Sequence, residues 1–380
     1  MSRFILLFAF LLMGSTACSV TAQDAQVAVA ELPAPDRPSA VAAQRLPAYE
    51  PRFGRTRPVV AVVGENHYTE LTDYVVPYGI LADSGVAEVW ALATQPGPIR
   101  MFPAPLKVEP QATTAAFDSR FPDGADYVIV PAVHRDDDPT LIAWVTAQAR
   151  KGATIVGVCD GVWVLARAGL LNGRKATGHW YAFQDLRKKF PQTDWQTDRR
   201  YVADGKLITT TGVTATIPVS FALVEAIAGT GRATGVAASL GGSEASLSPA
   251  HSSQRFQFAW RHKFTVAGNF LSFWAHEDVG IAVAPGVDEI ALALQAEVYS
   301  ATYRSTAYTV APQPGSFKTR RGLTIIPDRV AGKDAPRRLL PPLDEARPLQ
   351  ALDQALKGIE ADYGPRTAAW VALQMEYIGN

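Results

Sequence analysis

The segment from Thr154 to Leu171 constrains the fold of this chain more than any other. It begins with the apolar, mostly β-branched run TIVGV, which is typical of a short buried strand. Gly157 and Gly161 then flank Cys159 and allow the chain to turn sharply. The apolar residues that follow have helical spacing: Val162, Leu165, Ala166 and Gly169. The sequence therefore predicts a strand–turn–helix elbow with Cys159 at its tip.

An elbow of this kind holds a nucleophile at the mouth of a sheet, at the N-terminus of a helix. We expect that position to favour a thiolate, because the helix dipole and the free backbone N–H groups stabilise negative charge. The alternative is a small cysteine that only fills the core, which is the usual role of a lone cysteine. The two flanking glycines favour the functional interpretation of Cys159.

The composition sets wide limits on function. The chain has 380 residues, enough for two domains. Its 36 basic and 36 acidic residues balance, so the overall charge gives no argument for binding nucleic acid or an anionic membrane. The six histidines show no metal-ligand spacing, and no Gly-rich phosphate loop is present. We therefore expect no metal and no cofactor.

Residues 1–22 have the features of a secretory signal peptide, with Arg3 before the apolar run Phe4–Met13. Cleavage after Ala22 and lipid attachment at Cys18 both remain open, and either removes Cys18 as a free thiol. Residues 23–56 are rich in Ala, Pro and Gln, which predicts a flexible linker. We expect an exported protein, in a bacterial periplasm or anchored to a membrane as a lipoprotein.

Apolar segments and helical patterns alternate from residue 57 onward. This alternation predicts a mostly parallel sheet with helices on both faces. The expected strands are Val59–Val63, Val86–Thr94, Ala125–Pro131, Thr154–Val158 and Lys206–Thr211. The expected helices are Thr69–Ser84, Asp136–Arg150, Val162–Gly169, Gly212–Ile227 and Gly231–Leu240.

Residues 250–380 carry a faint internal repeat. The sequence LATQPG at Leu92–Gly97 returns as VAPQPG at Val310–Gly315. We predict a shortened, degenerate second copy of the first domain, which lacks an elbow cysteine and serves a structural purpose. The aromatic segment Arg255–Trp274 is dense enough to suggest an interface, but we expect it to pack between the two copies. The segment Asp328–Pro348 is too short for the missing strand and helix.

The segment Val158–Trp180 resembles the ThiJ/PfpI family of the class I glutamine amidotransferase-like superfamily. It carries the pattern VCxGxxxLAxAGLLxGRxATxHW. Weaker similarity lies at Leu71–Leu81 and at Thr210–Ala215. The resemblance covers residues 57–242, which we predict to be a ThiJ/PfpI-like domain. The resemblance implies a flavodoxin-like sandwich. The most similar family members are isonitrile hydratases and the domains found in helix-turn-helix regulators. No helix-turn-helix pattern is apparent in this sequence.

The resemblance also implies roles for three residues. Cys159 would be the nucleophile, and Asp73 would hold or exchange a proton with it. His179 matches the histidine of the family's His-Trp pair, which lies near the site. The alternative roles are a solvated helix residue for Asp73 and a buried structural histidine for His179.

Four further residues are expected to line the binding site. Glu65 and His134 follow predicted strands, at the sheet edge where open α/β sheets bind ligands. Asp160 adds a negative charge that opposes a thiolate, while its backbone N–H remains a donor to an oxyanion. Val133 stands where family members commonly have a glycine, which puts the second oxyanion donor in doubt.

These observations suggest a cysteine-dependent hydrolase or lyase-type enzyme, including hydratases, that acts on a small carbonyl, amide or isonitrile compound. The alternative is a non-catalytic domain that binds a ligand or senses redox state through Cys159. The expected partner is a small molecule and not a nucleic acid. An internal pseudodimer of the two copies, or a homodimer, remains possible.

Overall fold

The computed structural model describes residues 45–250 and 256–377. The predicted signal peptide, Cys18 and most of the predicted linker lie outside these residues. Within the described residues, no helix combines the length and the apolar character needed to cross a membrane.

A seven-stranded sheet with the order β11-β12-β8-β7-β1-β3-β6 forms the centre of the first half. Neighbouring strands are parallel except β11 and β12. Along the chain, β1, β3, β7, β8 and β12 occupy the flavodoxin order 2-1-3-4-5, as the sequence predicts. The strands are β1 (Val59–Gly64), β3 (Glu88–Ala93), β6 (Ala112–Thr113), β7 (Tyr127–Val130), β8 (Thr154–Gly157), β11 (Tyr201–Asp204) and β12 (Leu207–Thr210).

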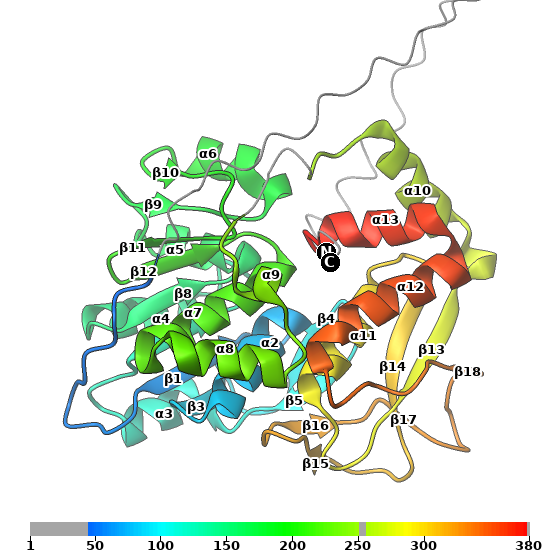
Figure 1. Cartoon of the computed structure of the whole chain (residues 1–380), viewed down its shortest axis with the longest axis horizontal. Helices are drawn as coiled ribbons and strands as arrows, with labels where there is room; N and C mark the ends of the chain where they lie inside the picture. The colour runs from blue at the N-terminus through cyan, green and yellow to red at the C-terminus, as the bar shows by residue number, and fades with distance from the viewer. Residues whose placement is uncertain (1–44, 251–255, 378–380) are drawn as a thin grey trace, which may run out of the picture. The chain divides into compact units, whose positions relative to one another are not determined.

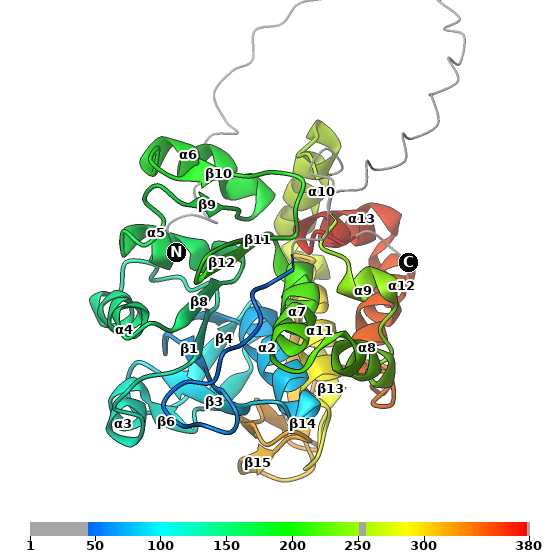
Figure 2. The same ribbon diagram turned by 60° about the vertical axis from the view of Figure 1, so that its left-hand side comes forward.

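Helices cover both faces of this sheet (Figures 1 and 2). Side chains alternate along β1, so Val60 and Val62 join one apolar core while Val59, Ala61 and Val63 join the other. Helices α2 and α7 belong to the first core, and α4 and α5 to the second. The helices of this half are α2 (Leu71–Ser84), α3 (Thr114–Arg120), α4 (Pro139–Arg150), α5 (Val162–Arg167), α6 (Phe183–Lys189), α7 (Thr216–Ala228), α8 (Thr230–Ser239) and α9 (Glu244–Leu247).

The second half is built on a four-stranded sheet with the order β17-β14-β13-β18. Its strands are β13 (Glu277–Ala282), β14 (Ser305–Ala311), β17 (Arg329–Val330) and β18 (Arg338–Leu339), and its helices are α10 (Trp260–Leu271), α11 (Glu289–Ser300), α12 (Ala351–Tyr363) and α13 (Pro365–Gln374). The unit β13-α11-β14 has the same element order and the same six-pair parallel register as β1-α2-β3. Strands β17 and β18 flank it as β6 and β7 flank the first unit.

The two halves pair through equivalent elements. Strand β5 (Lys107–Glu109) pairs antiparallel with β16 (Thr324–Ile326). Helix α2 packs against α11, and a Cβ atom on Gly79 would approach Ile290 Cγ1 to 2.6 Å. Both α7 and α12 end at a glycine in the same conformation, with φ 84 and ψ 165 at Gly229 and φ 85 and ψ 163 at Gly364. These matches support the prediction of a second copy.

Short elements complete the described chain. The β5–β16 pair lies in a five-stranded sheet with β2 (Thr69–Glu70), β4 (Ile99–Phe102) and β15 (Phe317–Lys318), and β9 (Lys175–Ala176) pairs with β10 (Asp194–Trp195). The 3₁₀ turns are η1 (Cys159–Gly161), η2 (Trp180–Ala182), η3 (Val213–Ala215), η5 (Phe273–Ala275) and η6 (Pro348–Gln350).

Two details of the second half differ from the sequence prediction. The segment 328–348 provides two two-residue strands, β17 and β18, although it forms no helix before η6. The aromatic segment does not simply pack between the halves, because Trp260, Phe264 and Trp274 are 68%, 72% and 75% exposed. The aromatic residues of this segment have helical spacing, and spacing alone does not reveal which side of a helix faces solvent.

Candidate active site

The elbow has the predicted form of strand, turn and helix. Strand β8 ends at Gly157, η1 begins at Cys159, and α5 follows directly. Cys159 has a φ of 51°, which is strained for a residue with a side chain. Gly161 must be a glycine, because a Cβ atom there would lie 2.0 Å from the carbonyl oxygen of Val130. The backbone N–H of Cys159 donates to Thr210 Oγ1 at 3.0 Å, which fixes the elbow to the end of β12.

Asp73 is fully buried in the first turn of α2. Its Oδ2 accepts a hydrogen bond from the Ala132 backbone N–H at 3.1 Å. Its Oδ1 is buried and has no hydrogen-bond partner among the described residues. Burial raises the pKa of Asp73 well above its ordinary value, and the charge of Glu297 raises it further. The result is a carboxyl group that tends to hold its proton.

The thiol of Cys159 does not have the thiolate character expected from its place at a helix N-terminus. Burial raises its pKa well above the ordinary value, and the charges of Asp73, Asp160, Glu70 and Glu376 act in the same direction. The helix dipole falls off within about one turn, so it does not offset burial among several carboxylates. Burial and these charges therefore favour the protonated thiol.

Glu297, which no sequence argument singled out, comes from α11 in the second half. It accepts hydrogen bonds from the backbone N–H of Thr72, at 2.8 Å, and from the Thr72 hydroxyl. Burial raises its pKa. The available signal was a glutamate on an otherwise apolar helix, EIALALQAEVYS, which favours a buried acid over a solvated one.

Glu70, Asp73 and Glu297 form an acidic cluster beside the elbow. Glu70 caps α2, since its Oε2 accepts from the Asp73 backbone N–H at 3.1 Å. Burial and then the charges of Glu297 and Asp73 raise the pKa of Glu70 well above its ordinary value. Among the described residues, no ion pair joins the cluster to a lysine or arginine. Retained protons therefore limit the repulsion between the three groups.

His179 faces the second half of the chain. Its Nε2 lies 3.0 Å from the carbonyl oxygen of Gln374 and 3.9 Å from Glu376 Oε1. Glu376 in turn accepts from the Trp180 backbone N–H at 3.2 Å. No hydrogen bond recorded among the described residues joins His179 to Cys159. The structure thus ties His179 to the C-terminal segment and leaves its catalytic role a prediction.

The four predicted binding residues lie at the carboxyl edge of the sheet. The Asp160 Oδ2 accepts from the Tyr181 hydroxyl at 2.8 Å. Glu65 is 2% exposed, and its Oε1 lies 2.8 Å from His67 Nδ1. Val133 forms an isolated antiparallel bridge with Thr69.

His134 packs at a tilt against two aromatic rings, with its centroid 4.3 Å from that of Phe102 and 5.0 Å from that of Tyr68. Burial lowers the pKa of His134. An imidazole that packs against aromatic rings and whose pKa is lowered fits the wall of a pocket better than it fits a proton donor.

Two backbone N–H groups next to Val133 are already engaged. The Ala132 N–H, in the segment that carries glycines in family members, donates to Asp73. The His134 N–H likewise donates to the Tyr68 carbonyl at 3.0 Å. Within residues 45–250 and 256–377, no group of three or more histidine, cysteine, aspartate or glutamate side chains is arranged to hold a metal ion.

Residues 59–226 match the profile of the DJ-1/PfpI family. They are a DJ-1/PfpI-family domain. The helix-turn-helix-type transcriptional regulator CdhR of Pseudomonas aeruginosa is 40% identical over 86 residues, which are 23% of this chain and 25% of the regulator. The isonitrile hydratase of Pseudomonas putida is 35% identical over 96 residues, which are 24% of this chain and 40% of the hydratase. The chain thus spans well under half of the length of either relative.

Solved structures of DJ-1/PfpI proteins are also similar to this chain. Drosophila melanogaster DJ-1beta has a TM-score of 0.44 and 19% identity, and covers 49% of this chain and 99% of its own. A ThiJ/PfpI family protein from Pseudomonas syringae has a TM-score of 0.43 and 23% identity, and covers 50% of this chain and 81% of its own.

Proposed function

We propose that the protein is a cysteine-dependent enzyme that adds Cys159 to the electrophilic carbon of a small carbonyl, amide or isonitrile compound. The observation that carries this proposal is the pairing of a strained elbow cysteine with a buried carboxyl group. Cys159 has a φ of 51° at the end of β8, and the charge of Asp73 acts directly on its thiol. Strain at one backbone position persists where the surrounding structure holds it, often for function.

The proton transfers follow from the raised pKa values. As Cys159 Sγ bonds to the substrate carbon, we propose that protonated Asp73 gives its proton to the substrate and takes the proton of the thiol in exchange. For an amide, the protonated amine then leaves as the carbon–nitrogen bond breaks, and a thioester remains. For an isonitrile, the proton goes to the same carbon as the sulfur, and a thioimidate forms. Water attacks the sulfur-bound carbon, the carbon–sulfur bond breaks, and a proton from the water restores the thiol. With an aldehyde, the addition of the thiol is simply reversible. Because the pKa values of both groups are raised, the exchange starts from a protonated thiol and a protonated carboxyl group.

The size of the substrate is limited by the site. Cys159 is only 7% exposed. Two hollows on the described surface, at residues 282–287 and around residues 54–59, are not lined by Cys159. A linear or very small electrophile suits this geometry, and the hydratase among the relatives acts on isonitriles by its name.

Turnover of a small panel of aldehydes, amides and isonitriles tests the proposal. The wild-type chain should convert one class, and Cys159→Ser should abolish that conversion while leaving the thermal unfolding midpoint unchanged. A Cys18→Ser chain is the matched control and should remain active. Absence of turnover across the panel, or activity that survives in Cys159→Ser, contradicts the proposal of a cysteine-dependent enzyme.

The second candidate function is ligand binding or redox sensing without catalysis. Two observations favour it: the Ala132 N–H already donates to Asp73, and the acids around Cys159 raise the pKa of its thiol. Reversible oxidation of Cys159 by dilute peroxide, without turnover of the panel, would support it. The regulators among the relatives contain this domain in DNA-binding proteins, but we propose no nucleic acid as a partner.

Export is part of the proposal. It rests on the sequence of residues 1–22, which the described structure does not include. Expression in bacteria with mass analysis of the mature chain distinguishes the two routes. Cleavage before Gln23 indicates a free periplasmic protein, a lipid on Cys18 indicates a lipoprotein, and an intact Met1 in the cytoplasm contradicts both.

A further inference from the structure

Helix α10 buries polar side chains and exposes large apolar ones, which is the reverse of an ordinary surface helix. Its buried side chains are the polar ones, His262 and Asn269. Asn269 Nδ2 donates to the Thr302 carbonyl at 2.9 Å and to Thr367 Oγ1 at 3.2 Å. The His262 ring lies near that of Trp370, with 6.4 Å between the centroids. Polar contacts thus fix one side of α10 to its neighbours, and its large apolar side chains point outward.

Five exposed apolar side chains of α10 and η5 define a surface that we call the α10 face. They are Trp260, Phe264 and Leu271 on α10 and Phe273 and Trp274 on η5, with exposed fractions of 68%, 72%, 59%, 74% and 75%. The three on α10 are separated by four and seven residues, which places them on one side of the helix. Exposed apolar patches of this kind mark interaction sites, because water alone does not stabilise them.

Charge identifies the kind of partner. The chain as a whole is neutral, yet no aspartate or glutamate occurs from Ala245 to His276, while Arg255, Arg261 and Lys263 do. The Lys263 Nζ lies 4.3 Å from the centre of the Trp260 ring. Aromatic rings flanked by basic side chains are typical of helices that lie in the interface of an anionic bilayer.

We propose that the α10 face docks the protein onto a phospholipid bilayer that carries anionic headgroups. The rings would enter the boundary between headgroups and acyl chains, with α10 parallel to the membrane plane. Arg261 and Lys263 would contact phosphate groups. A second copy of this chain is a poorer occupant, because a two-fold contact would gather the basic side chains of both copies in one interface, with no aspartate or glutamate from residues 245–276 to offset them.

Vesicle co-sedimentation of the full chain tests this proposal. The chain should bind vesicles of phosphatidylcholine and phosphatidylglycerol more tightly than vesicles of phosphatidylcholine alone. A double variant, Trp260→Ser with Phe264→Ser, should bind about tenfold or more weakly, since each buried aromatic contributes free energy of the order of a tenfold factor. Replacing Arg261 and Lys263 by glutamine should remove the preference for the anionic vesicles.

Matched controls separate this face from other apolar segments. Leu271→Ser should weaken vesicle binding, whereas Leu339→Ser should not, although the two leucines are 59% and 53% exposed. Circular dichroism checks that each variant is folded.

The proposal is overturned if the double variant sediments like wild type, because another segment then binds the lipid. It is also overturned if the chain ignores vesicles and forms a dimer that Trp260→Ser dissociates, because the face is then an interface between copies. Neither outcome depends on the chemistry of Cys159.

Discussion

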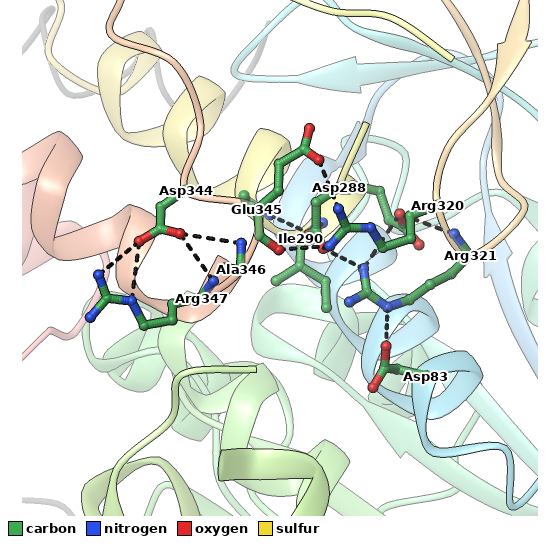
Figure 3. Close-up of polar contacts among 11 residues, drawn as sticks. Asp83, Asp288, Ile290, Arg320, Arg321, Asp344, Glu345, Ala346 and Arg347 are labelled. Atoms are coloured by element: carbon green, nitrogen blue, oxygen red, sulfur yellow. Dashed lines mark hydrogen bonds and ion pairs between the residues drawn. The ribbon is translucent and has the colours of Figure 1, made fainter. Parts of the chain in front are cut away.

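The two ends of the α2–α11 pair place similar acids in opposite electrostatic surroundings. At the start of α2, Glu70 and Asp73 meet Glu297 from the far end of α11. At the start of α11, Asp288 and Glu289 lie near the far end of α2, and there Arg321 links Asp83 and Asp288 at 2.8 Å each (Figure 3). The second end contains a buried arginine where the first has no ion-paired cation among the described residues.

This difference shows where the fold tolerates uncompensated acids. Both helices begin with an acidic cap, since Glu70 accepts from the Asp73 N–H and Asp288 from the Ala291 N–H. The end beside the cysteine elbow holds three acids whose pKa values burial raises. Burial also raises the pKa of Glu289 at the other end, but there the charge of Arg321 acts in the opposite direction. The other end belongs to the half of the chain that has no elbow, and its acids are paired into a structural ion network. We infer that the missing cation preserves a proton-holding site.

The largest expected effect is the loss of activity in Asp73→Asn. Asparagine keeps the hydrogen bond to the Ala132 N–H but cannot accept the thiol proton, so the rate constant should fall about 10²- to 10⁴-fold. Its stability should not fall, because the change removes a buried acid. Asp83→Asn, at the other end, is the control and should leave turnover unchanged in kinetic assays. Equal losses in both variants would remove the distinction between the ends.

The next effect is on stability, in Arg321→Leu. The Arg321 side chain is 6% exposed and contacts Asp83, Asp288 and Glu289. Its removal leaves Asp83 and Glu289 unpaired and Asp288 with Arg320 alone, so the free energy of unfolding should fall by about 3–5 kcal/mol in denaturant titrations. Arg320→Leu is the matched control, since that side chain is 41% exposed and its loss should matter much less. Similar losses for both would contradict a buried ion network.

A smaller effect concerns pH. The pKa values of Glu70, Asp73 and Glu297 are raised in the folded state, so folding retains protons that the unfolded chain releases above about pH 4. The cluster's contribution to stability is therefore complete at acidic pH and is lost as pH rises through the raised values.

Glu297→Gln should weaken that dependence. The variant should gain stability over wild type as pH rises, by up to about 1.4 kcal/mol for each unit by which the pKa is raised. Unfolding curves from pH 5 to 8 measure the difference. A variant that instead loses stability relative to wild type at higher pH would mean that Glu297 acts as a paired carboxylate.

The smallest effect is expected for Glu376→Gln. Its charge is the weakest of the four that raise the pKa of the Cys159 thiol. Removing it should lower that pKa slightly and speed alkylation at neutral pH by about two- to threefold. The rate of iodoacetamide modification in a Cys18→Ser background measures this. An unchanged rate would limit Glu376 to its contact with Trp180.

The first half was predictable because its signals are local. Glycines around Cys159 and β-branched runs such as Val59–Val63 specify strands and an elbow within a few residues, and the structure agrees. Asp73 was found because it lies in a segment that resembles the family.

The remainder depends on tertiary contacts that no local pattern encodes. Glu297 lies more than two hundred positions along the chain from Thr72, whose backbone N–H donates to it. Arg321 forms ion pairs with acids on two helices. The helix-dipole argument for a thiolate at Cys159 did not include burial or the charges of Asp73, Glu70 and Glu376, all of which raise the pKa of the thiol. The exposure of Trp260 likewise depends on which side of α10 is fixed by Asn269.

The most direct test of this account is the pKa of the Cys159 thiol, taken from the pH dependence of its alkylation in a Cys18→Ser chain. We predict a value above that of a free cysteine in wild type, a lower value in Asp73→Asn and no change in Asp83→Asn. A wild-type thiol with a pKa below that of free cysteine, or one that Asp73→Asn does not alter, would contradict the proposed proton exchange between Cys159 and Asp73.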